Sequence, residues 1–498
     1  MLLFLHYYLS LFQQMKKVLY LLIIAGLTGC QTDKEKSSNL FEPVAPDFNN
    51  RTVTLPKGFN YTVLFSEGDS VANAAGAVAA AKGSQDMVVY IPIHNSSEHG
   101  WLYVNHEEHK PNALLGDGGG GSVFEVEKVN NQWKVKGAIR SIDFSGVGQT
   151  FRNCGGTLTP YGTILTTEEE FPQSNTEIIQ RFGITDTSDY NGKKKYMNYG
   201  WIVEVNPISG KALRKIKSFG RYRHEDVQCM PDNKTVYLTH DDQPSVLFRF
   251  VAENENDYSA GQLYAYHQLN NGTSGEWIAL PMHEDSLADA VNVALRRHAT
   301  MFVSTEWIEA VGNRLYITES GSRRFNFDKE VALGGEPAYH LYTHNRTEGN
   351  NYADPYGRLL AIDLTTLQTD VVINGGINPA DSLFCFASPD AMTSATINGK
   401  RYLIISEDSQ GYLNGKASAE ITARNETYNE VYFLDLSIQH PTINDLQRFM
   451  MAPEGCETTG NMFTPDGKTY FVSIQHPSAD NPAPFNKSSV IAISGFSK

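Results

Sequence analysis

RNCGGTLTPYGTILTTEE, residues 152–169, contains two short runs of strand-forming residues joined by the turn sequence Thr159-Pro160-Tyr161-Gly162. Two such runs around a tight turn are typical of an antiparallel β-hairpin. The first run begins near Cys154, and the second ends in Glu168 and Glu169. The hairpin therefore carries side chains that could bind a metal at its open end.

The second run of this hairpin belongs to a set of six segments, each a strand that ends in a polar or acidic residue. The six segments are WLYVNHEE (101–108), GTILTTEE (162–169), KTVYLTHDD (234–242), NRLYITES (313–320), KRYLIISED (400–408) and KTYFVSIQ (468–475). Their polar ends follow one another at intervals of 61 to 88 residues. Such intervals fit four-stranded blades with loop insertions, so we predict an all-β chain folded as a single six-bladed β-propeller.

In five of the six hairpins, the partner strand also begins with a possible metal ligand. These residues are Cys154, Glu225, Glu306, Asp390 and Glu457. Facing residues of a hairpin have position numbers whose mean falls in the turn, which pairs these five with Glu168, Asp241, Glu319, Glu407 and Gln475, respectively. A single acidic residue at a strand end is commonly an ordinary solvent-exposed residue. Five hairpins of one geometry predict side chains that converge on one mouth of the central channel.

The composition limits the other possibilities. The chain has 498 residues and a formal net charge of −15, so it lacks the basic face that nucleic-acid binding requires. One amphipathic stretch, residues 283–299, predicts a short helix, and residues 171–200, 320–357 and 409–430 predict long loops. No pattern encodes the oligomeric state, and we expect a monomer.

The start of the chain resembles an export signal. Basic Lys16 and Lys17 precede an apolar run, and Leu27-Thr28-Gly29-Cys30 resembles a lipobox. We therefore predict a signal peptide over residues 1–29 and a lipid anchor on Cys30.

The residues after Cys30 complete this organisation. Gln31 is typical of lipoproteins that are sorted to the outer membrane, which is the location we expect. The polar stretch that follows predicts a flexible tether over residues 30–50. The propeller then occupies residues 51–498.

Many carboxylates in one channel require bound cations, because like charges repel strongly away from water. Oxygen ligands alone favour hard ions such as calcium or magnesium. A thiolate at Cys154 would indicate a transition metal, but a small buried apolar side chain is an equally good interpretation of this residue. Cys154, Cys229, Cys385 and Cys456 show no C-x-x-C spacing, and one or two disulfides among these four remain possible.

These stretches together resemble the PhoX-type alkaline phosphatases. The similar motifs are NHEE (105–108), RNCGGTLTPYGTILTTEE (152–169), RYRHEDVQCMPDNKTVYLTHDD (221–242), SPDAMTSATINGKRYLIISED (388–408) and ETTGNMFTPDGKTYFVSIQHP (457–477), in the family's order. The resemblance implies a six-bladed propeller whose mixed iron–calcium cluster hydrolyses phosphate monoesters. It implies iron at Cys154, calcium at Glu306, and iron or calcium at Glu168, Glu169, Glu225, Asp390, Glu407 and Glu457.

The chain departs from this family at one motif. Where the family has Arg-Pro-Glu, this sequence has Ser304-Thr305-Glu306. The resemblance implies that the missing arginine holds the substrate phosphate beside Glu306, and a hydroxyl cannot replace a bidentate guanidinium. Arg323 or Arg324 could substitute for it, or both could be solvated loop residues.

Two histidines lie next to candidate ligands, and two other functions remain open. We interpret His224 and His476 as hydrogen-bonding neighbours of the metal ligands rather than as general acids. The cations could instead stabilise a non-catalytic surface propeller that binds a glycan or a protein. A calcium-dependent esterase or lactonase on a similar propeller is the third possibility.

Overall fold

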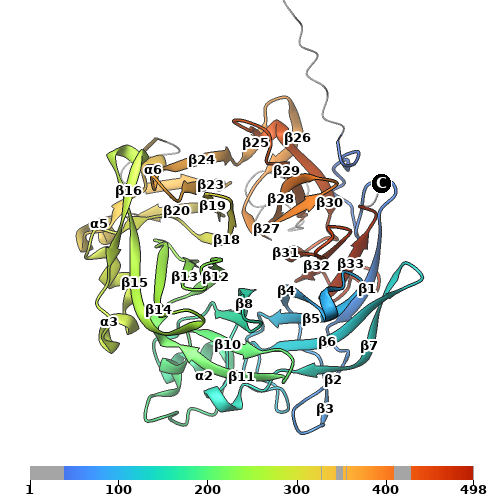
Figure 1. Cartoon of the computed structure of the whole chain (residues 1–498), viewed down its shortest axis with the longest axis horizontal. Coiled ribbons are helices and arrows are strands. Elements are labelled where there is room, and N and C mark those ends of the chain that lie inside the picture. Colours follow the sequence, from blue (N-terminus) through green and yellow to red (C-terminus); the bar gives the residue numbers. More distant parts are fainter. Residues whose placement is uncertain (1–38, 327, 344–350, 355, 409–427, 497–498) are drawn as a thin grey trace, which may run out of the picture. The chain divides into compact units, whose positions relative to one another are not determined.

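The computed structural model describes residues 39–326, 328–343, 351–354, 356–408 and 428–496. The chain forms two compact units, Met1–Glu42 and Pro43–Lys498, and the strands and helices described below belong to the second. Its strands build six sheets of four or more strands, which are the blades of a β-propeller (Figure 1). The predicted all-β, six-bladed fold is confirmed.

The first three blades follow one another along the chain. The first contains β4 (Gln85–Pro92), β5 (His99–His106), β6 (Gly121–Val129) and β7 (Gln132–Ser141), extended by β2 (Ser70–Ala72) and β3 (Val78–Ala80). The second contains β8 (Asn153–Leu158), β9 (Ile164–Glu168), β10 (Ile202–Asn206) and β11 (Lys211–Ile216). The third contains β12 (His224–Cys229), β13 (Thr235–His240), β14 (Phe248–Asn254), β15 (Asp257–Leu269) and β16 (Ser274–Ala279).

The other three blades complete the ring. The fourth contains β18 (Thr305–Val311), β19 (Arg314–Glu319), β23 (Arg358–Asp363) and β24 (Thr369–Asn374). The fifth contains β27 (Pro389–Ile397), β28 (Lys400–Glu407), β29 (Glu430–Asp435) and β30 (Leu446–Met451). The sixth contains β31 (Glu457–Phe463), β32 (Thr469–Gln475), β33 (Ser489–Ser494) and β1 (Asn60–Ser66).

The first strand of each blade lies closest to the channel. Strands β4, β8, β12, β18, β27 and β31 contact one another in this order, and β31 contacts β4. Figure 1 shows them around the centre of the ring. The six strands with polar ends predicted from the sequence are the second strands of the blades, and the five predicted hairpins have the expected topology. In the first blade the partner strand is β4, which the sequence analysis did not identify.

The ring is closed by strands from opposite ends of the chain. Strand β1 pairs antiparallel with β33, and Asn60 lies opposite Ser494. Residues before β1 also attach to the propeller, because the Asn50 amide donates to the carbonyl of Ala452 at 2.9 Å and Val44 N donates to Arg448 O at 2.9 Å. The packed chain therefore begins before residue 51, within the predicted tether.

The blades pack through apolar side chains from the two faces of each sheet. Between the first and last blades, the ring of Tyr90 stacks on Phe471 with centroids 5.6 Å apart, and Trp133 meets Phe471 edge to face at 5.2 Å. The Trp133 indole also donates to Thr469 Oγ1 at 3.0 Å. Aromatic contacts of this kind stabilise the interface by more than their buried area alone.

Helices are confined to the connections. The predicted helix at 283–299 is two short helices, α3 (Glu284–Ala288) and α4 (Ala290–Leu295), because Asp289 between them has the non-helical φ of −128°. The predicted loop 171–200 contains a helix, α2 (Asn175–Phe182), which the sequence analysis missed. Within the described residues, no helix is both long enough and apolar enough to cross a bilayer.

Shorter elements fill the predicted loop 320–357. They are β20 (Ser322–Asn326), α5 (Asp328–Leu333), β21 (Glu336–Pro337), α6 (Tyr339–Thr343) and β22 (Asn351–Asp354). Three further short strands lie outside the predicted loops, namely β17 (Thr300–Met301), β25 (Gly376–Asn378) and β26 (Asp381–Phe386). Residues 409–427 of the third predicted loop, and residues 1–38 with the predicted signal peptide and Cys30, lie outside the described residues.

The closing strand provides a test of the ring. Phe65 on β1 is fully buried, with its ring 5.3 Å from Phe124 of the first blade, so Phe65→Ala opens a cavity where the first and last blades meet. We expect the free energy of unfolding to fall by about 3–5 kcal/mol, with a lower Tm in thermal unfolding. Tyr61→Ala on the same strand is the control, because Tyr61 is 36% exposed. Equal effects of the two variants would contradict this account of closure.

Candidate metal centre

A β-bulge aims one side chain of the innermost strand into the channel in five blades. The pairing of the two inner strands shifts by one residue directly after Gln85, Asn153, His224, Thr305 and Pro389. A bulge bends its strand and redirects the extra residue. The residues that follow these positions are Asp86, Cys154, Glu225, Glu306 and Asp390. In the sixth blade the shift lies deeper, and Glu457 faces Gln475 directly.

The bulge at Cys154 explains the glycine two residues later. Gly156 has a φ of +143°, and a Cβ at this position would lie 2.1 Å from the carbonyl oxygen of Leu165. Only glycine fits such a close approach of two strands. The Cys-Gly-Gly sequence is therefore required by the backbone that presents the thiol.

The second strand of each blade contributes the residue just after its last paired residue. This residue lies one position beyond the predicted facing residue in four blades, but in the third blade it is Asp241, the predicted residue itself. The contributing residues are Glu107, Glu169, Asp241, Ser320, Asp408 and His476, and all six line one pocket. Successive residues of an extended chain point to opposite faces, so the residue before each of these turns away from the pocket. Of the five predicted facing pairs, only Glu457 with Gln475 is correct, because the bulges displace the others by one or two residues.

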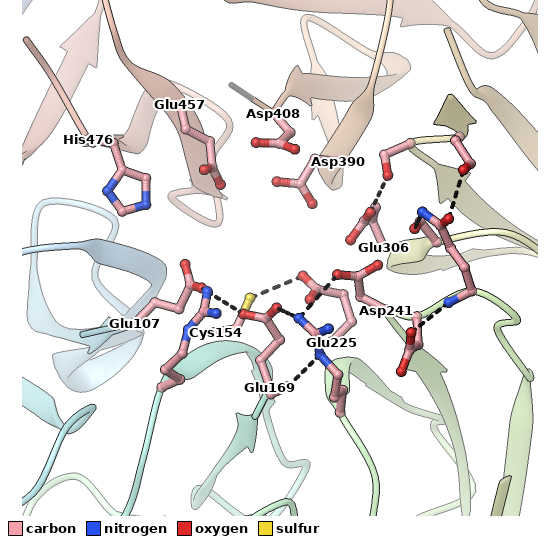
Figure 2. A pocket seen from close by; sticks show the side chains of 18 residues that line it. Glu107, Cys154, Glu169, Glu225, Asp241, Glu306, Asp390, Asp408, Glu457 and His476 are labelled. Carbon is pink, nitrogen blue, oxygen red and sulfur yellow. Dashed lines mark hydrogen bonds and ion pairs between the residues drawn. The ribbon is translucent and has the colours of Figure 1, made fainter. Parts of the chain in front are cut away.

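The pocket has a volume of about 730 Å³ and is lined almost entirely by polar groups (Figure 2). Its nine carboxylic acids are Glu107, Glu169, Glu225, Asp241, Asp242, Glu306, Asp390, Asp408 and Glu457. Cys154 contributes a thiol, and Arg152 and Arg223 contribute guanidinium groups. The predicted convergence of acidic side chains from separate blades is therefore observed.

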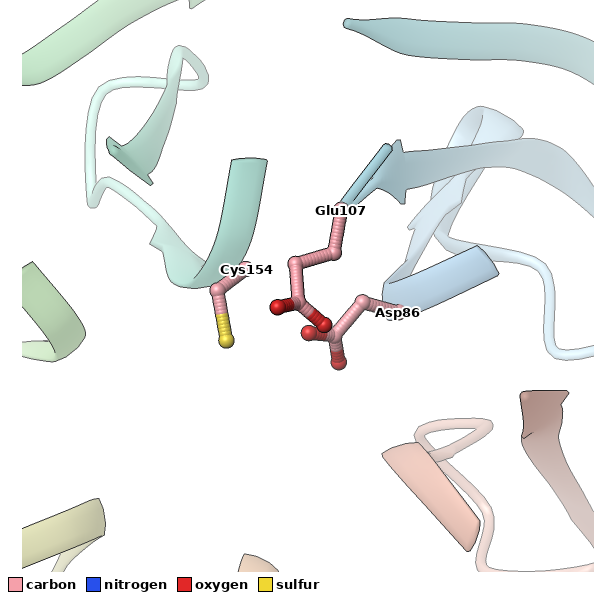
Figure 3. A group of neighbouring side chains, drawn as sticks. All are labelled: Asp86, Glu107 and Cys154. Carbon is pink, nitrogen blue, oxygen red and sulfur yellow. The ribbon is translucent and has the colours of Figure 1, made fainter. Parts of the chain in front are cut away.

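Three overlapping groups of side chains are arranged as metal ligands. They are Asp86, Glu107 and Cys154; Cys154, Glu169 and Glu225; and Glu225, Glu306 and Asp390. Within each group the ligand atoms lie within 4.8 Å of one another, and all members are buried. Figure 3 shows the first group, with carboxylates from the first blade facing the thiol of the second. Because Cys154 and Glu225 are shared, with Cys154 Sγ 3.1 Å from Glu225 Oε1, the groups form one continuous row.

The acids of this row cannot all be ionised without counter-charges. Burial, followed by repulsion from neighbouring carboxylates, raises four pKa values well above the usual range, those of Glu225, Glu306, Asp390 and Glu457. Burial likewise raises the pKa of Asp86 to about 6 and that of the Cys154 thiol well above its usual value. Bound cations would restore the ionised forms. Carboxylate oxygens with one sulfur fit hard cations beside a transition metal.

Two of the predicted metal ligands face away from the pocket. Glu168 is fully buried and accepts hydrogen bonds from Lys215 Nζ at 2.7 Å, Thr150 Oγ1 at 2.9 Å and the backbone N–H of Trp201 at 3.1 Å. The prediction of Glu168 as a metal ligand is therefore wrong, since its charge is already balanced by Lys215. The neighbouring Glu169 takes its place in the pocket.

Glu407 repeats this pattern in the fifth blade. Its carboxylate accepts from the backbone N–H groups of Ala387 at 3.0 Å and Glu430 at 3.1 Å, and it does not line the pocket. The prediction of Glu407 as a ligand is wrong for the same geometric reason, and Asp408 faces the pocket instead.

Ser304-Thr305-Glu306 stands where the family has Arg-Pro-Glu, and the structure describes only part of its surroundings. Ser304 lines the pocket, and its Oγ accepts a hydrogen bond from Gln243 Nε2 at 3.2 Å. The predicted phosphate-binding candidates Arg323 and Arg324 lie in β20, and their side chains fall outside the described part of the chain.

The two histidines have different environments. His476 lines the pocket, and burial lowers its pKa to about 4. His224 instead turns into its blade, where Nε2 lies 2.9 Å from Gly220 O and the ring packs on Tyr222 with centroids 3.6 Å apart. His476 is therefore placed as the sequence analysis expected, but His224 does not contact the pocket.

Seven charged residues of the site were not on the list of predicted metal ligands. They are Asp86, Glu107, Arg152, Arg223, Asp241, Asp242 and Asp408. Glu107, Asp241 and Asp408 could have been found by aligning the six second strands on their last paired residue, because the next position is the one that enters the channel. Nothing in the sequence marked the two arginines.

The cysteines do not form disulfides with one another. Cys154, Cys229, Cys385 and Cys456 are all buried thiols. Cys154 lies against Glu225 in the pocket, which favours the metal-ligand interpretation over that of an apolar side chain.

Comparisons with known proteins agree with this architecture. The family model described as "Alkaline phosphatase PhoX" matches residues 39–478. PhoX of Pseudomonas fluorescens, solved in complex with vanadate, is 20% identical, with a TM-score of 0.69, and the match covers 91% of this chain and 98% of that one. At this identity the likeness shows the fold. No curated protein has a significant sequence match to the chain.

More distant solved structures share only the general shape. A Trichoderma reesei carbohydrate-active enzyme of family AA12 is 9% identical, with a TM-score of 0.42 and coverage of 91% of this chain and 100% of that one. A Trypanosoma rangeli sialidase in complex with the inhibitor DANA is 10% identical, with a TM-score of 0.38 and coverage of 89% and 60%. Scores this low carry no argument about function.

The assignment of Glu168 to the fold and Glu169 to the pocket can be tested. Lys215→Met leaves a buried carboxylate without its counter-charge, so we expect a loss of about 3–5 kcal/mol in the free energy of unfolding. The double variant Glu168→Gln/Lys215→Met should recover most of this stability and keep the wild-type metal content in elemental analysis. Glu169→Gln, the matched neighbour, should lose metal. Loss of metal in the double variant would instead indicate that Glu168 is a metal ligand.

Proposed function

Because this chain belongs to the alkaline phosphatase PhoX family, we propose that it is a metal-dependent phosphatase that hydrolyses phosphate monoesters in the channel pocket. The observation that carries this proposal is the row of shared ligands around Cys154 and Glu225, which joins five blades at one site. The vanadate complex of the Pseudomonas fluorescens protein, described as a transition-state analogue complex, supports a phosphoryl group as the substrate.

We further propose a mixed cluster of iron and calcium. Cys154 would hold iron together with carboxylates on either side of it, since a thiolate selects a transition metal over calcium. The all-oxygen group of Glu225, Glu306 and Asp390 would hold calcium. When bound, such cations neutralise the carboxylates, polarise a phosphoryl oxygen and activate a water molecule for attack on phosphorus.

The protein's own groups prepare the site for this chemistry. Ligands come from the ends of paired strands rather than from loops, so their positions are set by the blade backbones. Burial disfavours the ionised acids until cations arrive, so binding of cations is coupled to the release of protons. His476 has a pKa near 4 and is neutral at neutral pH, so it can accept a hydrogen bond but does not supply a proton to the leaving group.

The location of the enzyme is a separate proposal. The lipobox at Leu27 to Cys30 supports export across the cytoplasmic membrane, cleavage before Cys30 and attachment to the outer membrane through acyl chains on that residue. The chain of residues 31–43 would then separate the anchor from the propeller. A monomer satisfies this arrangement, because one chain supplies every ligand group of the pocket.

The role of the thiol gives the first test. We expect Cys154→Ala to lose its iron, to keep part of its calcium, and to hydrolyse p-nitrophenyl phosphate at a rate reduced by roughly 100-fold or more, since even groups one step removed from a metal cost about 10–100-fold when changed. Elemental analysis and the hydrolysis rate measure both effects. Cys229→Ala is the control, because Cys229 is buried outside the pocket.

The same measurements separate the competing functions. Full retention of iron by Cys154→Ala would show that the Cys154 thiol is not an iron ligand. Calcium without iron in the wild-type protein, together with inactivity toward phosphate esters, would favour the non-catalytic binding propeller. Hydrolysis of p-nitrophenyl acetate or a lactone, but not of p-nitrophenyl phosphate, would favour the esterase.

The anchor gives the second test. We expect Cys30→Ala, expressed from the full-length gene in a bacterial host, to move the protein from the membrane fraction to the soluble fraction, because no acyl chain can then be attached. Immunoblots of the separated fractions measure the shift, and Cys229→Ala should fractionate like the wild type. A Cys30→Ala protein that stays with the membrane would contradict lipid anchoring.

A further inference from the structure

The six blades present a second series of equivalent positions at the rim of the pocket. The residue two positions before each innermost-strand acid or thiol is Ser84, Arg152, Arg223, Ser304, Ser388 or Gly455. Five of the six have a positive φ, 49° at Ser84, 42° at Arg152, 49° at Ser304, 49° at Ser388 and 79° at Gly455. Residues other than glycine rarely adopt this conformation, and it is found where a structure over-determines it. The blade design therefore sets the backbone at these positions, while the side chain differs from blade to blade.

Only two of these rim positions carry a positive charge. The Arg152 guanidinium lies 2.8 Å from Glu169 Oε2 and 3.2 Å from Glu170 Oε1, and it also contacts Glu107. The Arg223 guanidinium lies 3.0 Å from Glu169 Oε1. The two arginines thus contact the Glu169 carboxylate from neighbouring blades. The equivalent position of the next blade holds the uncharged Ser304.

The partners of these arginines are themselves candidate metal ligands. Glu107 and Glu169 belong to two of the three ligand groups. Both guanidinium groups contact the carboxylate of Glu169, which is buried. Cations bound at Glu107 and Glu169 would neutralise these carboxylates in place of the arginines. The positive charge of the guanidinium groups would then be available to an anion in the pocket.

A phosphate monoester needs such charge to enter this site. Its dianionic phosphoryl group must approach nine carboxylic acids, which repel it except where cations intervene. The Arg152 and Arg223 side chains are 19% and 29% exposed, so both reach the open part of the pocket. A guanidinium offers a planar fork of N–H donors that matches two oxygens of a tetrahedral anion.

We propose that Arg152 and Arg223 bind the non-bridging oxygens of the substrate phosphoryl group, replacing the positive charge that Ser304 does not supply. This inference rests on the proposed phosphatase function, since it assigns the substrate-binding groups of the same pocket. The competing interpretation is that both arginines only neutralise Glu169 and organise the metal ligands.

Alanine variants separate the two interpretations. We expect Arg152→Ala and Arg223→Ala to keep the wild-type iron and calcium content and Tm, but to raise the Kd for orthophosphate on the order of 10- to 100-fold each, as charge-assisted hydrogen bonds are lost. Calorimetric titration with orthophosphate measures this binding without turnover. In assays with p-nitrophenyl phosphate, KM should rise by a similar factor.

Arg181→Ala is the matched control. Arg181 contacts Glu170 Oε1 at 3.4 Å, as Arg152 does at 3.2 Å, but it lies on α2 and does not line the pocket. Its removal should therefore leave orthophosphate binding unchanged. Arg152→Lys keeps the charge but loses the fork, and should fall between the wild type and Arg152→Ala.

The equivalence of the rim positions allows a rescue. Ser304 has nearly the same backbone φ as Arg152, so an arginine can be accommodated at this position in the neighbouring part of the rim. We expect the double variant Arg152→Ala/Ser304→Arg to regain part of the orthophosphate affinity. An arginine on a different blade could not restore the orthophosphate affinity if Arg152 only stabilised its own strand.

The outcomes distinguish this inference from the function on which it rests. Normal orthophosphate binding by both alanine variants, or loss of metal in step with loss of binding, overturns the assignment of the arginines. A metal-loaded wild-type protein that binds orthophosphate but hydrolyses no phosphate ester overturns the proposed function alone. In that case, calorimetric titration of the variants would still test whether Arg152 and Arg223 bind orthophosphate. A wild-type protein that neither binds orthophosphate nor hydrolyses phosphate esters overturns both.

Discussion

The carboxylates of Glu225, Glu306 and Asp390 approach within 4.8 Å of one another, and all three side chains are buried. Like charges at this distance repel strongly, and burial adds a further penalty for ionisation. A protein can keep such groups only if they are protonated or if cations share their charge. The shape of the pocket, its nearly complete lack of apolar lining and its few arginines are all consistent with the second arrangement. The metal centre is thus the counter-charge around which six blades can close.

The acids that point into the blades have their charge balanced by partners within the protein. Glu168 is neutralised by Lys215, Glu319 by His340 at 3.1 Å, and Glu407 is satisfied by backbone N–H groups. Each of these acids is one residue away from a pocket residue on the same strand. The fold therefore provides internal partners for one face of each strand end and leaves the other face for external cations. A metal site and a stable blade can coexist because adjacent residues point in opposite directions.

The pocket is also pseudo-symmetric in its backbone but not in its side chains. Bulges occur at equivalent places in five blades, and positive φ angles occur at five of the six rim positions. Different side chains at these positions give each sector of the rim its own chemistry, with a thiol and two guanidinium groups on one side and hydroxyl groups on the other. This division lets one sector receive an anion while the rest binds cations.

Local features of the sequence were enough to determine the blades. Alternating strand residues and turn motifs identified the second strand of all six blades and the complete inner hairpin of five, and Cys154, Glu225, Glu306, Asp390 and Glu457 were correctly directed toward the channel, because strand period and turn chemistry act over a few residues. Whether Glu168 or Glu169 enters the pocket depended on a one-residue bulge, and a one-residue slip exchanges the two faces of a strand. The partner of Glu168 lies 47 residues away on another strand, and Arg152 meets Glu107 across a blade boundary. The first pairing needs a complete second blade and the second needs two blades side by side, so tertiary structure alone decided which acids and which arginines face the pocket.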